Sequence, residues 1–127
     1  MKIVFTNGCF DVLHRGHVEL LKYCKSLGTV VVGLNSDESV RELKGPSRPR
    51  FTQEDRQAML ESCRFVDQVI VFNEETPYNL IKLVSPDIIV KGGDYKEDEV
   101  VGCELAEVKI FNYLEGYSTS NILGDVK

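Results

Sequence analysis

The sequence predicts an α/β fold, an open parallel sheet of five strands with helices on both faces. Short apolar runs rich in β-branched residues alternate along the chain with amphipathic stretches of helical period. The runs are continuously apolar, as in strands buried on both faces of a sheet. Crossovers between parallel strands are right-handed. No linker interrupts the alternation, so residues 1–127 are expected to form a single domain around one core.

The first half of the chain is expected to hold two strands and three helices. Apolar runs place the strands at 2–6 and 29–34. The first helix is expected at 17–27, followed by Gly28 as its C-terminal cap. The other helices are a short one at 37–43 and one that begins after the N-cap residue Thr52 and turns inward Met59, Leu60 and Cys63.

The second half continues the pattern, and the whole is typical of a Rossmann-like sheet. Thr76 and Pro77 predict the start of a helix, with a cap followed by proline at the first helical position, and Pro86 ends that helix. The remaining elements are strands at 66–72, 87–91 and 108–111 and a closing helix at 118–126.

Composition excludes several classes of protein. With 20 acidic and 15 basic residues the net charge is −5, so a general nucleic-acid binder or a protein that binds anionic membranes is not expected. No run approaches the roughly 20 apolar residues of a membrane span, and the N-terminus lacks a signal-peptide pattern, which predicts a cytoplasmic protein. The cysteines form no Cys-x-x-Cys pair, which predicts reduced thiols and no zinc site at Cys9, Cys24, Cys63 and Cys103.

A basic segment contrasts with this acidic background. Between positions 41 and 50, a single acid, Glu42, is outnumbered by Arg41, Lys44, Arg48 and Arg50. A local positive loop on an acidic protein indicates a small anionic ligand. The alternative for Arg48, Arg50 and Arg56 is that they are solvated, and this is the interpretation kept for Arg50.

Polar motifs follow the predicted strands at their carboxyl ends, where ligands bind in open parallel sheets. These motifs occupy 7–17, 35–37, 91–95 and 115–120. In the last of them, a glycine before three hydroxyl residues at a helix start can form a phosphate cradle or a simple helix cap. The two glycines at 92–93 can likewise let backbone approach a nucleotide or form an ordinary turn.

The stretch 7–17 has the clearest chemical pattern. It leaves the first strand and enters the first helix, so His14 and His17, on either side of Gly16, lie near the free N–H groups and the positive dipole end of that helix. Such a place suits a polyphosphate. The alternative is that one histidine caps the helix and the other packs, but their pairing after an Asn-Gly turn favours phosphate binding. Cys9 is expected to be a packing residue, not a nucleophile.

These residues resemble the His-x-Gly-His nucleotidyltransferase superfamily, also called cytidylyltransferase-like. The resemblance covers nearly the whole chain and is closest to the heptose 1-phosphate adenylyltransferase domain that makes ADP-heptose. Glycerol-3-phosphate cytidylyltransferase is a near relative, but Tyr113 and Leu114 stand where its motif has an arginine that grips the nucleotide phosphates. The matching motifs are Gly8-Cys9-Phe10-Asp11, His14-Arg15-Gly16-His17, Asn35-Ser36-Asp37, Leu43-Lys44-Gly45 with Ser47-Arg48-Pro49, Val90 to Tyr95, and Gly116 to Ile122.

The resemblance implies three groups of site residues. The catalytic group is His14, His17 and Lys44. The group on the acceptor side is Asp11, Asn35 and Arg48. The group that binds the nucleotide and its phosphates is Asn7, Gly8, Cys9, Phe10, Asp11, Gly16, Lys91, Gly93, Asp94, Glu115, Ser118 and Thr119.

The implied reaction joins a nucleoside monophosphate from an NTP to a sugar phosphate and releases pyrophosphate. ATP and D-glycero-D-manno-heptose 1-phosphate are the expected substrates, and the alternative is CTP with glycerol 3-phosphate. Mg²⁺ is the expected cofactor, held mainly by the NTP phosphates, so no protein metal site is expected. Relatives are commonly homodimers, which is an expectation for this chain by analogy. An alternative of another class is a regulatory module that binds a nucleotide without catalysis.

Overall fold

Five parallel strands form one sheet in the order β3-β2-β1-β4-β5. The computed structural model describes residues 1–93 and 95–112, so the closing helix expected at 118–126 lies outside the described residues. The predicted strands are confirmed within about two residues at each end. Their observed bounds are β1 Ile3–Gly8, β2 Thr29–Asn35, β3 Gln68–Phe72, β4 Ile88–Gly92 and β5 Glu107–Phe111.

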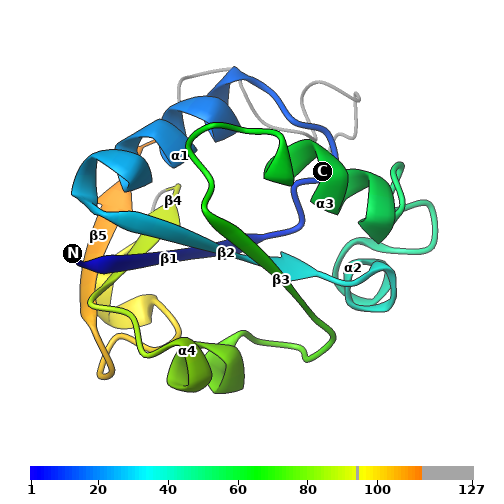
Figure 1. The fold of residues 1–127 in the computed structure, drawn as a ribbon. Helices are drawn as coiled ribbons and strands as arrows, with labels where there is room; N and C mark the ends of the chain where they lie inside the picture. Colours follow the sequence, from blue (N-terminus) through cyan, green and yellow to red (C-terminus); the bar gives the residue numbers. More distant parts are fainter. Residues whose placement is uncertain (94, 113–127) are drawn as a thin grey trace.

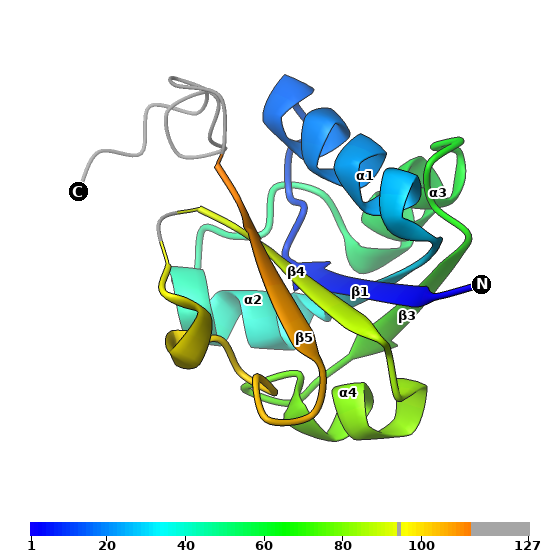
Figure 2. The ribbon, with the colours of Figure 1, turned by 90° about the vertical axis from the view of Figure 1, so that its left-hand side faces the viewer.

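The helices cover both faces of this sheet, as predicted (Figure 1). In that view α1 and α3 lie above the sheet, α4 lies below it, and α2 follows the end of β2. Figure 2 shows the same layers from the side, with β5 at the edge of the sheet. The bounds are α1 Arg15–Leu27, α2 Asp37–Lys44, α3 Gln53–Glu61, α4 Tyr78–Val84 and the short 3₁₀ helix η1 Glu97–Glu99. No helix in the described part of the chain is long and apolar enough to cross a bilayer.

Each face of the sheet has its own apolar cluster. On the first face, Leu20 and Leu21 of α1 and Leu60 of α3 pack on Val4, Val30 and other strand residues. On the second face, Leu80 and Ile81 of α4 pack on Phe5, Val31 and Ile89. Consecutive strand residues alternate between the two clusters, which explains why the strands are continuously apolar.

Three details of the predicted helices are wrong. α1 begins two residues earlier than expected, because His14 is its N-cap. α4 has Pro77 at its N-cap position without a side-chain cap, so Thr76 does not cap it. Met59 is 42% exposed. Met59 therefore does not belong to the inner face of α3, which Leu60 occupies.

Gly28, between α1 and β2, lies so close to the backbone of Lys2 that a side chain would not fit there. A Cβ atom at this position would lie 2.2 Å from the carbonyl oxygen of Lys2. That same oxygen accepts a hydrogen bond from the N–H of Thr29 at 2.8 Å, at the start of the β1–β2 pairing. The close approach of the two backbones, and not a left-handed cap, therefore requires glycine here.

Gly28→Ala is expected to lower the free energy of unfolding by about 1 to 3 kcal/mol, because the methyl group must push the Lys2 carbonyl out of its hydrogen bond. Urea unfolding measures this change. Lys22→Ala, on the exposed side of α1, is the control and should stay within about 0.5 kcal/mol of the wild type. Equal stability of Gly28→Ala and the wild type would contradict the steric explanation.

Candidate active site

A pocket of about 610 Å³ lies at the carboxyl ends of β1, β2 and β4, where the sequence predicts ligand binding. β1 is central, and the chain moves from it to β2 and β3 on one side and to β4 and β5 on the other, so the pocket lies where the connections diverge. Among its lining residues are many of those predicted for the site, namely Asn7, Gly8, Cys9, Phe10, Asp11, His14, His17, Asn35, Lys44, Arg48 and Lys91.

The pocket also has walls that the site predictions left out. These residues come from α2, the ends of β3 and β4, the segment before α4 and the stretch between β4 and β5, and they are Leu43, Phe72, Glu75, Thr76, Pro77, Gly92, Tyr95 and Val101. Gly16, which the sequence placed in the site, is buried in the first turn of α1 and is not among the lining residues, and neither is Gly93. The predicted site residues Asp94, Glu115, Ser118 and Thr119 lie outside the described part of the chain.

The two histidines are held together at the start of α1. The His14 side chain accepts a hydrogen bond from the N–H of Gly16 at 3.0 Å, and the N–H of His14 donates to Nδ1 of His17 at 3.3 Å. Their rings stack with centroids 3.8 Å apart, and Phe10 packs against His17 at 5.1 Å. The interpretation of one capping and one packing histidine thus describes their local structure. Because both rings line the pocket, this role is compatible with phosphate contact.

Both imidazoles are neutral at physiological pH. Burial, together with the neighbouring His14, lowers the pKa of His17 to about 3, against the effect of a hydrogen bond with the Val12 backbone. Burial also lowers the pKa of His14. Since Nδ1 of each ring accepts a backbone N–H, the proton of the neutral ring belongs on Nε2. The pair therefore places two neutral imidazoles at a helix N-terminus, an environment that suits the oxygens of a phosphate.

Asp11 anchors the segment after α2 to the loop after β1. Its carboxylate, 2% exposed, accepts the Nε–H of Arg48 at 2.6 Å and the backbone N–H groups of Arg50 and Phe51 at 2.7 and 3.0 Å. Burial alone would raise the pKa of Asp11, but these hydrogen bonds outweigh burial and lower it. Arg48 is 4% exposed, so its interpretation as a solvated residue is wrong.

Arg56 is a second buried cation, and its structural role was missed. Its side chain, in a residue only 1% exposed, donates to the carbonyl oxygens of Cys9, Asn35 and Phe51 at 2.7, 2.8 and 3.0 Å and to the Asp37 carboxylate at 2.9 Å. One guanidinium thus joins the ends of β1 and β2 to α2 and α3. The solvated interpretation is wrong for this residue too. Its position four residues before Leu60 was the available signal, because both then lie on the inner face of α3.

Two lysines complete the positive side of the pocket. Lys44 ends α2 and is exposed, whereas Lys91, near the end of β4, is partly enclosed. Burial lowers the pKa of Lys91, and the charge of Lys44 lowers it further. Burial raises the pKa of Cys9, which keeps its thiol protonated and agrees with a packing role for that side chain.

Acidic ligands for a metal are scarce around the pocket. In the ranges 1–93 and 95–112 no group of three or more His, Cys, Asp or Glu residues is arranged to hold an ion. Of the lining carboxylates, Asp11 is already engaged and Glu75 stands on the exposed segment before α4. This donor set fits a cation that arrives with phosphate groups.

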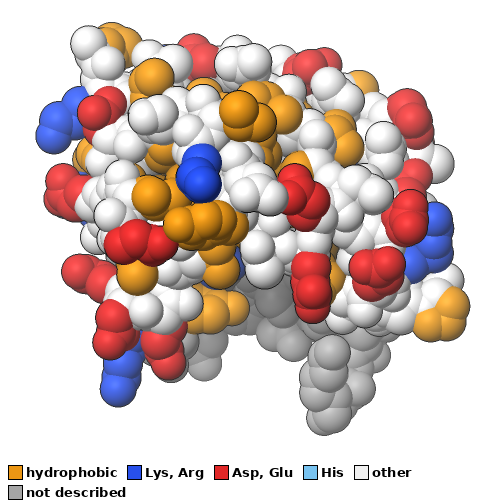
Figure 3. Space-filling model, turned by 90° about the horizontal axis from the view of Figure 1, so that it is seen from below, with side chains coloured by type: hydrophobic (Ala, Val, Ile, Leu, Met, Phe, Trp, Pro, Cys, Tyr) orange, Lys and Arg blue, Asp and Glu red, His pale blue; other side chains and the backbone are white. Residues whose placement is uncertain are grey.

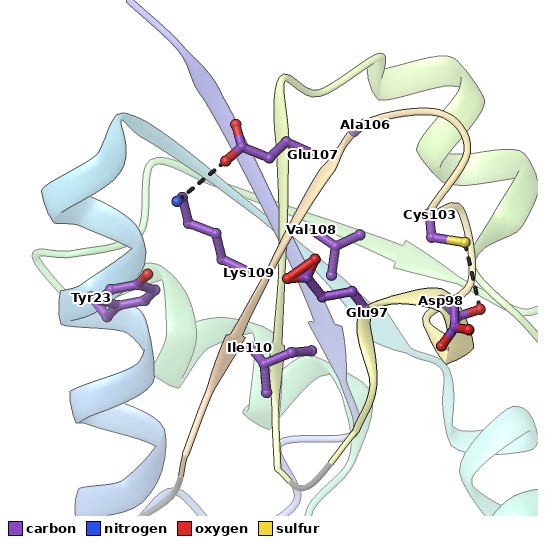
Figure 4. Close-up of a pocket in the computed structure, with 9 residues that line it drawn as sticks. All are labelled: Tyr23, Glu97, Asp98, Cys103, Ala106, Glu107, Val108, Lys109 and Ile110. Atoms are coloured by element: carbon purple, nitrogen blue, oxygen red, sulfur yellow. Dashed lines mark hydrogen bonds and ion pairs between the residues drawn. The ribbon is translucent and has the colours of Figure 1, made fainter.

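Two other parts of the described surface differ in chemistry from the pocket. The face below the sheet carries scattered acidic side chains and few basic ones (Figure 3). A second hollow of about 630 Å³ lies along the edge strand β5 (Figure 4). Three carboxylates and one lysine line it, which disfavours an anion, and they are Glu97, Asp98, Glu107 and Lys109.

The fold and the pocket define an α/β protein of the Rossmann-like class, with candidate phosphate-binding groups at the carboxyl ends of parallel strands. A family model described as cytidylyltransferase-like matches residues 5–122, and the chain belongs to this family. The bifunctional protein HldE of Wolinella succinogenes is 56% identical over 99% of this chain, and that of Helicobacter pylori is 53% identical over 99%. The chain spans only 27% and 28% of the length of these two relatives.

Solved structures agree with this family. The lipopolysaccharide core biosynthesis protein of Thermoplasma volcanium is 31% identical and superposes with a TM-score of 0.75, over 93% of this chain and 99% of that one. A pantothenate synthetase of Thermus thermophilus superposes with a TM-score of 0.66 over 100% of this chain and 62% of its own. At 16% identity it shares only the fold.

Arg56→Met is expected to lower the free energy of unfolding by about 3 kcal/mol, because it leaves buried carbonyl groups without their donor. Chemical denaturation measures the loss. Arg41→Met, at an exposed position of α2, removes a cation of the same kind and should change stability by less than about 0.5 kcal/mol. Similar losses in both variants would show that the Arg56 hydrogen bonds are not stabilising.

The low pKa of His17 predicts a stability that falls in mild acid. In the unfolded chain His17 becomes protonated below a pH of about 6.5, whereas in the folded protein it stays neutral until about pH 3. The free energy of unfolding therefore decreases as the pH falls from 7. The stability difference between the wild type and His17→Gln should change by about 2 kcal/mol, to the disadvantage of the wild type, from pH 7 to pH 5. Urea titrations at both pH values measure it. A pH-independent difference would contradict a buried neutral His17.

Proposed function

We propose that this chain is a heptose 1-phosphate adenylyltransferase, which transfers AMP from ATP to D-glycero-D-manno-heptose 1-phosphate. The observation that carries the proposal is the pocket that joins His14, His17 and Lys44, together with 52 to 56% identity to the HldE proteins over nearly the whole chain. The Thermoplasma protein named for lipopolysaccharide core biosynthesis supports a sugar of that pathway as acceptor.

The reaction is a substitution at phosphorus. An oxygen of the acceptor phosphate attacks the α-phosphorus of ATP, a new P–O bond forms, and the bond from the α-phosphorus to the bridging oxygen breaks, so that pyrophosphate leaves with the bonding electrons. A phosphate monoester has a second pKa of about 6 and is largely a dianion at neutral pH, so no catalytic base is required. The protein must align the two phosphate groups and stabilise the charge that develops on their oxygens.

The roles proposed for the side chains come from the resemblance, and their positions in the pocket support them. The neutral His14 and His17 at the N-terminus of α1 are proposed to contact the triphosphate, where the helix dipole also favours negative charge. Lys44 acts near the α-phosphate and the attacking oxygen. Asp11 and Arg48, which resemblance assigns to the acceptor side, contribute by holding the wall of the pocket, since each is a hydrogen-bond partner of the other.

Magnesium is proposed as the cofactor. Mg²⁺ carried by the triphosphate would neutralise charge on the phosphate oxygens, and the histidine and lysine side chains would contact the remaining oxygens. This division suits a pocket whose described lining has only two carboxylates, Asp11, which is bound to Arg48, and Glu75.

A pyrophosphate-release assay tests the proposal. ATP, CTP, GTP and UTP are each combined with heptose 1-phosphate and with glycerol 3-phosphate in the presence of Mg²⁺, and a chelator serves as the control for the metal. We expect release with ATP and heptose 1-phosphate, with kcat/KM at least about tenfold above every other pair.

Two other results would replace the proposal. Efficient release only with CTP and glycerol 3-phosphate would make the protein a glycerol-3-phosphate cytidylyltransferase. Tight nucleotide binding without release from any pair would indicate a regulatory binding module.

A further inference from the structure

Lys91 lies on the opposite side of the sheet from the histidine pair. Along β4, Ile89 packs in the cluster under α4 and Val90 in the cluster under α1. Because strand residues alternate, Lys91 shares the face of Ile89, away from α1. Its side chain still lines the same pocket, with Nζ 5.0 Å from the centroid of the Tyr95 ring.

This lysine carries a positive charge that no acidic side chain in the ranges 1–93 and 95–112 balances. Among the described residues Lys91 forms no ion pair with a carboxylate. Burial and the neighbouring Lys44 both disfavour its charged form and lower its pKa. The two carboxylates that line the pocket are Asp11, which is bound to Arg48, and Glu75, and neither forms an ion pair with Lys91 or Lys44 in the described residues. Two neighbouring ammonium groups in a partly enclosed pocket become more favourable when an anion binds between them.

The reaction requires two phosphate groups in this pocket. The triphosphate has its place at the N-terminus of α1, next to His14 and His17. A second anion that approaches the α-phosphorus from the other side meets the face of β4 that carries Lys91, beside Tyr95 and near Lys44. The positions of the neutral histidine pair and of the two lysines therefore match the two reactants.

We propose that Lys91, together with Lys44, binds the phosphate of the acceptor substrate, so that Lys91 sets acceptor affinity and not nucleotide affinity. The inference rests on the proposed function, because it assumes two phosphate reactants. It assigns to the acceptor a residue that the sequence placed among the nucleotide-binding ones. Lys91 is then the group that makes the site select a phosphorylated acceptor over a free sugar.

The test compares Lys91→Met and Lys91→Gln with the wild type and with Lys22→Met, a matched change at an exposed position of α1. We expect KM for the acceptor phosphate to rise at least about tenfold in both Lys91 variants, while KM for the nucleotide changes less than about twofold. Lys91→Arg should recover part of the acceptor affinity, because it restores the charge. Lys22→Met should match the wild type.

Calorimetric binding of heptose 1-phosphate and of glycerol 3-phosphate keeps this test separate from turnover. Loss of acceptor-phosphate binding in folded Lys91 variants, with nucleotide binding kept, would support the inference even if the heptose assay fails. A raised nucleotide KM with unchanged acceptor KM, or unchanged binding of either phosphate ester, would overturn it. If the wild-type protein binds neither ester, both the proposed function and this inference are wrong. If the wild type turns over heptose 1-phosphate and Lys91→Met has an unchanged KM for it, only the inference is wrong.

Discussion

The pocket depends on one buried carboxylate. Asp11 follows β1, and by accepting hydrogen bonds from Arg48, Arg50 and Phe51 it brings the segment after α2 back over the end of the sheet. This contact is a buried attachment for a segment whose residues just before Arg48 are mostly exposed. The Arg56 guanidinium adds a parallel connection from α3 to the ends of β1 and β2. Two buried charges of opposite sign thus fix a wall that short polar loops alone could not hold.

The sheet could be predicted because its signal is local, whereas the attachments of the site could not. Continuous apolar runs such as Val30 to Val32 identify strands wherever they occur, and the errors at strand ends arise because polar residues such as Asn35 still pair with a neighbouring strand. The His14 and His17 pattern indicated the correct end of α1 because its spacing is also local. Arg56 gave no comparable signal, since its partners Cys9 and Asn35 lie 47 and 21 positions away. The walls formed by Phe72, Thr76 and Pro77 were missed for the same reason.

The histidine pair shows how one set of contacts serves stability and chemistry. The backbone N–H groups that occupy Nδ1 of both rings also fix the ring orientations and the tautomer, so little reorganisation is needed when phosphate arrives. The stacking of His14 on His17 would be unfavourable if both rings carried a positive charge. Burial lowers the pKa of His17 and so keeps that ring neutral. The same burial that packs the two rings against each other therefore also disfavours their protonation.

The two sides of the pocket differ in how far apart along the chain their contacts are. The histidine cap closes over two and three positions, whereas the contacts of Asp11 span 37 to 40. Short loops close at a smaller entropic cost than long ones, so the cap can form as soon as α1 does, while the Asp11 wall must wait until β2, α2 and the start of α3 have assembled. The folding chain would therefore hold the histidine-lined end of α1 before it gains the wall that shapes the rest of the pocket.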